Sequence, residues 1–427
     1  MENNKTPSIR FKGFTDPWEQ RKFDEVFDCT IPNNTLSRAE LNYESGSVRN
    51  IHYGDILIKY GSVVDVQSDE IPFVTGKSND DFKGALLQDG DIIIADTAED
   101  ETTGKACEIG NSQGLDVVSG LHTMVCRPRN KMALGYLGYY LNSDAYHHQL
   151  LPLMQGIKVL SLSRTNVQKT MVCYPKSKAE QQLIADCFRN LDNLITLHQR
   201  KYNKLLNVKK SMLEKMFPKN GSNIPEIRFK GFTDPWEQRK LGELVDRVVR
   251  KNINNESTLP LTISAQYGLV DQITYFNNRV ASRDVSNYYL VLNGEFAYNK
   301  STSDGYPFGA VKRLDLYEKG VLSTLYIVFA PKKEQQIDSD YLTVFFDTDR
   351  WHKGVAERAA EGARNHGLLN ISAENFFDID LSVPKDIVEQ KQIGAFICQL
   401  DNLITLHQRE LEKLQNIKKS MLEKMFV

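Results

Sequence analysis

The acidic residues are the first candidates for chemistry in this chain, because nuclease and metal sites are built from carboxylates. The triplets DFK (81–83) and EQK (389–391) come nearest to the acidic-x-lysine pattern of nucleases, but each stands isolated. A cluster of acids at Asp96, Glu99, Asp100 and Glu101 offers oxygen ligands that could hold a divalent cation. A solvated acidic loop explains the cluster more simply, so we predict no catalytic carboxylate.

Other catalytic signatures are missing from the sequence. A methyltransferase needs a [DN]-P-P-[YFW] loop, whereas TDPW has one proline and occurs twice, at 15–18 and 233–236, which favours a structural turn. Two of the three tryptophans, Trp18 and Trp236, lie in this element, and we expect them to anchor it to its domain. The sequence has no GxxxxGK[ST] phosphate loop and no HExxH zinc pair. The six cysteines are scattered without a CxxC pair, which is typical of reduced thiols in a cytoplasmic protein. We predict that the chain is not an enzyme and holds no metal or cofactor.

The strongest pattern is an internal repeat. IRFKGFTDPWEQRK occurs at 9–22 and 227–240, LDNLITLHQR at 191–200 and 400–409, and KKSMLEKMF at 209–217 and 418–426. Matches of this length cannot arise by chance, so the chain is written twice. The stretches between the repeats have diverged and align only loosely. Because each copy is too long for a solenoid unit, we predict two homologous domains.

The closing segment of each copy is predicted to be a long helix with a heptad seam. No Gly or Pro occurs from Glu180 to Met216, and Pro218 then ends the helix. Apolar residues recur in alternating steps of four and three, as in a coiled coil, so we expect the two helices to pair in antiparallel orientation. The seam consists of Ile184, Phe188, Leu191, Ile195, Tyr202 and Leu205, and of Ile393, Ile397, Leu400, Ile404, Leu411 and Leu414.

Polar residues interrupt the seam at the same two places in both helices, at His198 and Lys209 and at their equivalents His407 and Lys418. A seam histidine can be a pH switch or a ligand, but more often it sets the register or faces solvent. Further leucines lie beside the seam and make a stripe wider than two paired helices need. This stripe either contacts the chain's own domains or docks another subunit, and it comprises Leu183, Leu194, Leu197, Leu213, Leu403, Leu406 and Leu422.

The middles of the two copies carry patterns of both strands and helices. Apolar runs bounded by turn residues predict strands at 54–61, 91–96, 122–128 and 324–330, and 136–150 and 341–352 predict short helices. The predicted fold is α+β, with two homologous domains joined by two long antiparallel coiled-coil helices in a pseudo-twofold internal repeat. The expected parts are a repeat element at 1–22, a first domain at 23–173, a central helical spacer at 174–222, a second domain at 223–382 that includes the repeat 227–240, and a C-terminal helical spacer at 383–427.

Charge is balanced overall but uneven along the chain. The 53 basic and 55 acidic residues give a net charge of −2, which by itself does not indicate a nucleic-acid binder. Residues 23–173 hold 12 basic and 20 acidic side chains and residues 241–382 hold 15 and 19, whereas residues 174–222 hold 10 and 4. A nucleic-acid surface on a middle domain must therefore be a local face. No apolar run approaches 18 residues and no secretory signal pattern opens the sequence, so we expect a cytoplasmic protein without a membrane span.

The repeated RFKGFTDPWEQRK and the repeated EQQ/EQK, LDNLITLHQR and KKSMLEKMF segments resemble the conserved regions of type I restriction–modification specificity subunits. The order of variable domain, helix, variable domain and helix is also similar, over essentially the whole chain. The resemblance implies that each middle is a target recognition domain for one half of a bipartite double-stranded DNA sequence. It implies that the helices form a spacer that docks two methyltransferase subunits and that restriction subunits join the complex. S-adenosylmethionine, ATP and Mg would then belong to the partner subunits.

The polar loops that align between the copies are candidates for DNA contact. Arg can bond guanine in a bidentate manner, and Asn can bond adenine. The segments GIKVLSLSR (156–164) and GARNHG (362–367) lie at the same point of each copy but differ, which favours them as reading loops. The candidates are Lys105, Lys158, Ser161, Ser163 and Arg164 in the first copy and Lys300, Arg358, Arg364, Asn365 and His366 in the second, with solvated surface as the alternative for each.

Two other functions stay open at this point. One is a stand-alone DNA modification or nuclease enzyme, which the missing motifs oppose. The other is a two-domain protein-binding scaffold, for which divergence of the middles would be unnecessary. Because the middles are acidic, we expect DNA binding by the chain alone to be weak and salt-sensitive.

Overall fold

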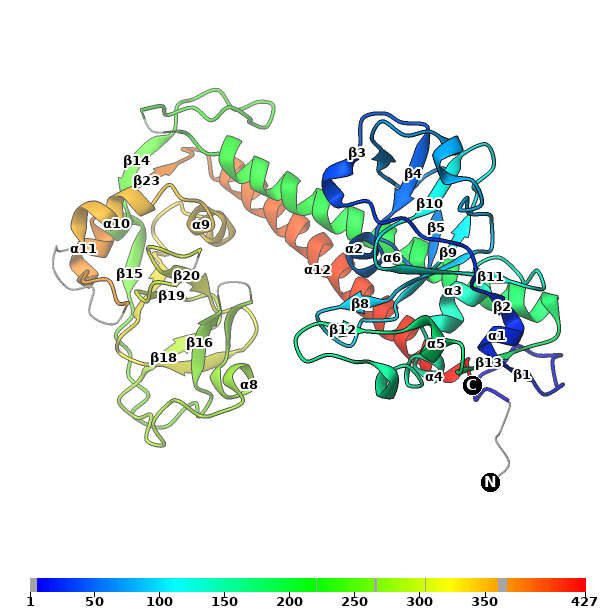
Figure 1. Ribbon diagram of the computed structural model, residues 1–427. Coiled ribbons are helices and arrows are strands. Elements are labelled where there is room, and N and C mark those ends of the chain that lie inside the picture. The colour runs from blue at the N-terminus through cyan, green and yellow to red at the C-terminus, as the bar shows by residue number, and fades with distance from the viewer. Residues whose placement is uncertain (1–5, 220, 265–266, 304, 360–366) are drawn as a thin grey trace. The chain divides into compact units, whose positions relative to one another are not determined.

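The computed structural model describes residues 6–219, 221–264, 267–303, 305–359 and 367–427. The chain divides into two compact units (Figure 1). Unit 1 comprises residues 1–199 and 409–427, and unit 2 comprises residues 200–408. Each unit therefore combines one middle with parts of both long helices. The mixed α+β fold with a tandem repeat and two long paired helices is confirmed.

Unit 1 is built on two sheets. Strands β2, β11, β7, β9 and β5 form one sheet in that order, and β10, β4, β6 and β3 form the other. The strands are β1 (Glu19–Lys22), β2 (Phe27–Asp28), β3 (Leu41–Asn42), β4 (Val48–Ile51), β5 (Val63–Asp65), β6 (Phe73–Val74), β7 (Ile92–Ala95), β8 (Thr97–Ala98), β9 (Ala106–Gly110), β10 (Asp116–Ser119), β11 (Thr123–Pro128), β12 (Leu160–Ser161) and β13 (Met171–Tyr174). The helices are α1 (Phe23–Val26), α2 (Tyr53–Ile58), α3 (Tyr136–Leu141), α4 (Asp144–His147), α5 (Arg164–Val167) and α6 (Lys178–Lys215).

Unit 2 repeats the plan with its own strands. Strands β15, β22, β19 and β20 form a sheet in that order, while β16 pairs with β17 and β18 with β21. The strands are β14 (Glu237–Lys240), β15 (Val245–Arg247), β16 (Leu261–Ser264), β17 (Gly268–Asp271), β18 (Tyr289–Leu292), β19 (Phe296–Asn299), β20 (Ala310–Arg313), β21 (Lys319–Leu322), β22 (Ile327–Pro331) and β23 (Asp380–Val383). The helices are α7 (Leu241–Leu244), α8 (Gln272–Phe276), α9 (Ser339–Phe346), α10 (His352–Arg358), α11 (Ala373–Phe377) and α12 (Ile387–Lys424).

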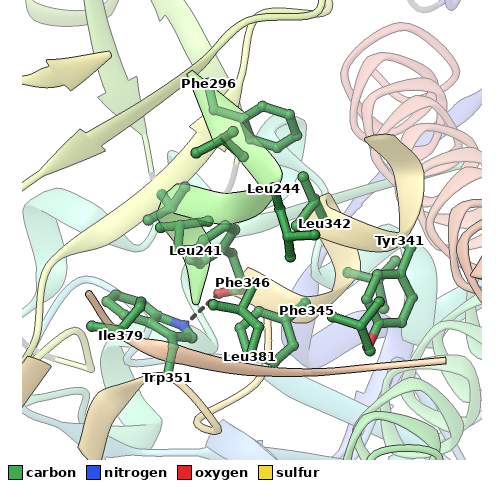
Figure 2. Packing of buried hydrophobic residues seen from close by; sticks show 14 of the residues in the cluster. Leu241, Leu244, Phe296, Tyr341, Leu342, Phe345, Phe346, Trp351, Ile379 and Leu381 are labelled. Carbon is green, nitrogen blue, oxygen red and sulfur yellow. Dashed lines mark hydrogen bonds between the residues drawn. The ribbon is translucent and has the colours of Figure 1, made fainter. Parts of the chain in front are cut away.

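Aromatic side chains dominate the core of unit 2. Figure 2 shows Phe345, Phe346 and Trp351 packed among leucine and isoleucine side chains from α7 and from the strand β23 region. The indole N–H of Trp351 donates to the backbone oxygen of Phe346 at 3.1 Å, which satisfies the polar atom of a buried ring. The short helices α9 and α10 thus attach to the sheet through their large apolar residues.

The repeated opening segment anchors the start of a long helix in each unit. In unit 1 the guanidinium of Arg10 donates to both carboxylate oxygens of Glu180, at 2.6 and 2.9 Å, and the Trp18 indole donates to the same carboxylate at 3.3 Å. In unit 2, Arg228, Glu389 and Trp236 repeat this arrangement at 2.6, 2.8 and 3.4 Å. Both carboxylates are buried, and a buried charge is tolerated only when it is paired and hydrogen-bonded. The repeated tryptophans therefore anchor the opening turn, as predicted.

The two long helices run antiparallel, as contacts inside each unit show. In unit 1, Phe188 near the start of α6 stacks on Phe426, just beyond the end of α12, with ring centroids 5.6 Å apart. In unit 2, Lys209 late in α6 forms an ion pair of 2.7 Å with Asp401 in the first half of α12. The seam residues named above are all buried or half-buried, and His198 and His407 are half-buried as well. The predicted helix pairing is confirmed.

The leucines beside the seam divide into two groups. Leu213 packs against the core of unit 2 and Leu422 against the core of unit 1, which is the contact with the chain's own domains. The other five are exposed, namely Leu183, Leu194, Leu197, Leu403 and Leu406. Three of these exposed side chains belong to unit 1 and two to unit 2, so each unit leaves leucines of its long helices open to solvent among the described residues.

Most predicted strands and short helices occur, but the strand predicted at 54–61 is wrong. Residues Tyr53–Ile58 form helix α2 instead. Ile56 and Tyr60, four residues apart, are buried, while Ile58 is exposed, which is the spacing of a helix face. A short apolar run cannot distinguish a strand from a buried helical turn. Among the described residues, no helix is long and apolar enough to cross a membrane.

Candidate nucleic-acid interface

The reading loop predicted in the first copy forms a hairpin at the surface of unit 1. Strand β12 pairs antiparallel with β8, and Gln155 and Ser161 exchange backbone hydrogen bonds of 3.0 and 2.8 Å below the tip. Figure 1 shows β8 and β12 side by side at the edge of unit 1. Leu162, which follows β12, is buried and donates its backbone N–H to the Asp96 carbonyl at 2.8 Å. The base of the hairpin is thus tied to the core, while residues 155–159 are exposed.

In unit 2 the described residues directly after the predicted loop pair with the residues that follow β19. Ser301 forms an antiparallel bridge with Leu368, and the Thr302 backbone N–H donates to the Gly367 carbonyl at 2.6 Å. These residues align with β8 and β12 in the sequence repeat. The predicted residues Arg364, Asn365 and His366 lie outside the described residues. Leu368, which directly follows the predicted loop, thus pairs with Ser301, and β12 pairs with the aligned strand β8 in unit 1.

The predicted contacts of unit 1 differ in how free their side chains are. Lys105 donates to the carbonyl oxygens of Leu57 and Tyr60, at 3.0 and 3.1 Å, and burial lowers its pKa. Its ammonium group therefore binds carbonyl oxygens at the C-terminal end of α2 and does not extend toward a nucleic acid. Ser163 caps α5 by accepting the Asn166 N–H at 3.2 Å.

The remaining predicted contacts of unit 1 lie on or next to the hairpin. Lys158 projects from the tip, and the Ser161 hydroxyl donates to the Gln155 carbonyl at 3.3 Å while staying exposed. Arg164 opens α5 and is half-buried. Among the described residues, neither Lys158 nor Arg164 lies within 4.0 Å of a carboxylate. Both cations are thus available to a phosphate.

In unit 2 the described candidates are held by the protein itself. Lys300 donates to the Ile371 carbonyl at 3.4 Å. Arg358 is paired with Asp378 at 2.9 Å and donates to the Gly354 carbonyl at 3.2 Å. Both side chains hold the segments that flank the loop, and neither extends freely into solvent.

An exposed aromatic and basic segment of unit 2 was not anticipated from the sequence. Tyr275 and Phe276 of α8 are exposed and meet edge to face at 5.0 Å, and Arg279 and Arg283 follow. Exposed rings beside cations suit stacking on bases and contact with phosphates. The interleaving of aromatic and basic residues in YFNNRVASR (275–283) was the signal that could have pointed to it.

The acidic candidates for catalysis have structural partners instead. Glu389 is the buried partner of Arg228, and Asp81 accepts the backbone N–H of Ser78 at 2.8 Å in a local cap. Asp100 accepts both the backbone N–H and the hydroxyl of Thr102, which lowers the pKa of that carboxyl. Within the described ranges, no group of three or more His, Cys, Asp or Glu residues is placed to hold a metal ion. These carboxylates therefore stabilise turns and helix starts.

The chain is similar in sequence and in fold to known specificity subunits. A sequence model described as the type I restriction modification DNA specificity domain matches residues 15–207 and again residues 233–416. The crystal structure of a type I restriction–modification S subunit from M. genitalium has a TM-score of 0.62 at 13% identity, covering 99% of this chain and 99% of that chain. The HsdS subunit from Thermoanaerobacter tengcongensis has a TM-score of 0.44 at 15% identity, covering 97% and 98%. The first of these structural likenesses supports the fold, and the two matched ranges coincide with the two copies of the repeat.

Proposed function

The chain belongs to the type I restriction–modification DNA specificity family, and we propose that each of its units reads one half of a bipartite DNA target. The observation that carries this proposal is that the two units share the same anchoring residues but have loops of different sequence. The Arg–Glu–Trp anchor is the same in both units, whereas the loops at β12 and at Leu368 differ in sequence. Homologous domains that read different sequences must keep their scaffold and differ at their base contacts.

The exposed leucines of the long helices support a role in assembly. Leu194 and Leu197 in unit 1 are 44% and 47% exposed, and their repeat equivalents Leu403 and Leu406 in unit 2 are 44% and 52% exposed. Two equivalent apolar faces on one chain suit two copies of the same partner, since exposed apolar patches mark interaction sites. We assign them to two modification (methyltransferase) subunits, with restriction subunits joining the full complex.

The chain itself is proposed to be non-catalytic. The acidic triplets are engaged in ion pairs and caps, and the sequence carries no methyltransferase, nuclease or ATPase motif. S-adenosylmethionine, ATP and Mg are therefore assigned to the partner subunits. A stand-alone modification enzyme would instead methylate DNA when the purified chain is given S-adenosylmethionine. A protein-binding scaffold would bind its partners but leave methylation of the genome unchanged.

Genome-wide mapping of methylated bases, with and without the gene, tests the function. We expect methylation of one bipartite motif to disappear when the gene is deleted. Exchanging residues 23–173 for those of a relative with a different target should change one half of that motif and leave the other half intact. Unchanged methylation after deletion would overturn the proposal.

Substitutions on the helices test the docking face separately. Leu194→Glu with Leu197→Glu should remove one of two modification subunits from the complex, as counted by native mass spectrometry, without changing the folding of the chain. Leu206→Glu is the matched control, because Leu206 is exposed on the same helix but has Gln415 at the equivalent repeat position. Retention of both subunits by the double variant would contradict the assignment.

A further inference from the structure

The tip of the hairpin that Gln155 and Ser161 close, next to β12, holds an isoleucine fully in solvent. Ile157 is 99% exposed and Val159 is 52% exposed. The residues directly below them are hydrogen-bonded across the hairpin, and Leu162 then enters the core of unit 1. Burial of an apolar side chain of this size stabilises a fold, so the exposed Ile157 side chain contributes little to the stability of unit 1.

Gly156 sets the shape of the tip. Its φ is +126°, and a Cβ added there would lie 1.9 Å from the carbonyl oxygen of Val159. A side chain at this position would therefore collide with the backbone, and only glycine fits. The chain reverses tightly at Gly156, so that residues 157–159 form the outermost part of the hairpin.

We propose, building on the DNA-reading function given above, that this hairpin enters the major groove and that Ile157 contacts the C5-methyl group of a thymine. The major groove admits a two-stranded ribbon, whereas the minor groove is about half as wide. Among residues 156–159, Lys158 alone has a polar side chain, so the tip is poorly suited to hydrogen-bonded base readout. The thymine methyl is the apolar feature that base edges present in the major groove.

The charges around the hairpin agree with insertion of the tip. Lys158 stands between the two apolar residues, and Arg164 follows β12, so that cations flank the tip and can meet phosphates. Glu99, Asp100 and Glu101 follow β8 and oppose adhesion of the hairpin base to the phosphate backbone. This distribution of charge favours contact between the tip and DNA and disfavours unspecific attraction between the rest of the hairpin and the phosphate backbone.

Replacement of thymine by deoxyuridine tests this contact, because it removes only the methyl group. The experiment uses the complete complex of the chain with its modification subunits and a duplex carrying the mapped motif. Each thymine in the half-site assigned to unit 1 is replaced in turn. We expect one replacement to weaken binding about fourfold, since one buried CH₂ corresponds to roughly that factor.

The variant Ile157→Ala should bind the thymine and deoxyuridine duplexes equally, at the level of the unaltered complex on deoxyuridine DNA. Ile58→Ala is the control, because Ile58 is an exposed isoleucine of the same unit outside the hairpin, and it should keep the fourfold difference. A half-site that tolerates every deoxyuridine, or that contains no thymine on either strand, overturns the proposal. So does an Ile157→Ala complex that still discriminates. In all these outcomes, methylation of a bipartite motif still supports the proposed function, whereas a chain without effect on methylation overturns that function itself.

Discussion

Glu180 and Glu389 show what a single repeated residue does in this protein. Each is buried at the start of a long helix and is held by an arginine and a tryptophan from the opening segment. The carboxylate thus joins two parts of the chain that are more than 150 residues apart in sequence. Because the guanidinium geometry is bidentate, neither a lysine nor a shorter acid would reproduce it.

Removal of one charge from this pair should strongly destabilise unit 2. Glu389→Gln leaves the guanidinium of Arg228, whose side chain is only 13% exposed, without its counter-charge, and breaking a pair of this kind costs about 3 kcal/mol. Urea unfolding followed by tryptophan fluorescence measures the change. Asp349→Asn is the control, because that side chain is exposed and its pair with Arg350 spans 3.5 Å, so no measurable change is expected. A Glu389→Gln protein as stable as the unaltered one would contradict the anchoring role.

Glu108 gives unit 1 a pH-dependent stability. Burial raises its pKa to about 7, although the backbone N–H groups of Gly135 and Gly138 donate to its two oxygens. The folded state therefore binds the proton more tightly than the unfolded state, and the stability this provides is complete below pH 4.5 and is lost as the pH rises to 7. Relative to Glu108→Gln, the natural chain should lose about 3 kcal/mol over this range. Unfolding free energies of both proteins between pH 4 and 8 test this, and a constant difference would refute it.

The partners of these side chains mark the limit of what the sequence alone could predict at this scale. The repeats singled out Trp18 and Trp236 as anchors, because repetition is visible without a structure. Glu389 resembled part of a nuclease triplet, because its true partner, Arg228, lies 161 residues away in the sequence and could not be identified from it. Lys105 resembled a DNA contact for the same reason, because the carbonyls that hold it are 45 and 48 residues away.

At the scale of elements, the two lysines that interrupt the helix seam have a common explanation. Lys209 of α6 pairs with Asp401 of α12 at 2.7 Å, and Lys418 of α12 pairs with Asp192 of α6 at 2.5 Å. The first lysine of each KKSMLEK repeat therefore pairs with the aspartate in the LDNL repeat of the other helix. Charged pairs at a seam fix which residues face each other, at some cost in stability.

The Lys418–Asp192 pair should contribute a measurable coupling energy. Both side chains are at most 30% exposed, so screening by water is partial, and we expect about 1 kcal/mol. A double-mutant cycle with Lys418→Met and Asp192→Asn isolates this term in urea unfolding. The exposed pair Lys353–Glu357, at 3.7 Å, is the comparison and should couple by much less. Equal coupling in the two pairs would show that the seam lysine has no special role.

Elements with a long period were predictable, and short apolar runs were not. The helices α6 and α12 were predicted correctly, because an apolar heptad pattern that continues over many turns is compatible with few structures other than a long helix. Helix α2 was predicted as a strand, because its identity depends on the pocket that receives Ile56 and Tyr60. The alignment of the copies predicts the reading loops at 156–164 and 362–367, and their role in DNA contact stays a prediction. The exposed pair Tyr275 and Phe276 was not predicted, because the interleaved pattern at 275–283 indicates a binding surface only when its aromatic side chains are exposed, which depends on the whole surface around them.

At the scale of the whole molecule, each unit closes through the same junction, but by different routes. In unit 2 the Ile227 N–H donates to the Lys215 carbonyl at 3.0 Å, across a short link in the chain. In unit 1 the Ile9 N–H donates to the Lys424 carbonyl at 3.0 Å, which joins residues near the two ends of the sequence. Phe217 packs on Trp236 as Phe426 packs on Trp18. The order of the two copies along the chain is therefore not essential to either unit.

A circularly permuted chain should consequently fold. Joining Val427 to Pro7 through a copy of residues 218–226 and opening the chain at 220 leaves both junctions in place. We expect its unfolding free energy to stay within about 1 kcal/mol of the natural chain, because no buried contact is lost. Opening at 96 instead, after the buried strand β7, should prevent folding and serves as the control. Circular dichroism and urea unfolding measure both, and an unfolded first permutant would contradict the equivalence of the junctions.

The exposed tip at Ile157 has a consequence for the history of such proteins. Substitutions at exposed positions usually change stability by less than about 0.5 kcal/mol, whereas the buried anchors carry the fold. A population of variants can therefore drift through many tip sequences without crossing the stability threshold that purges unfolded chains. New DNA targets can therefore arise by single substitutions at the tip, because the stable scaffold tolerates them.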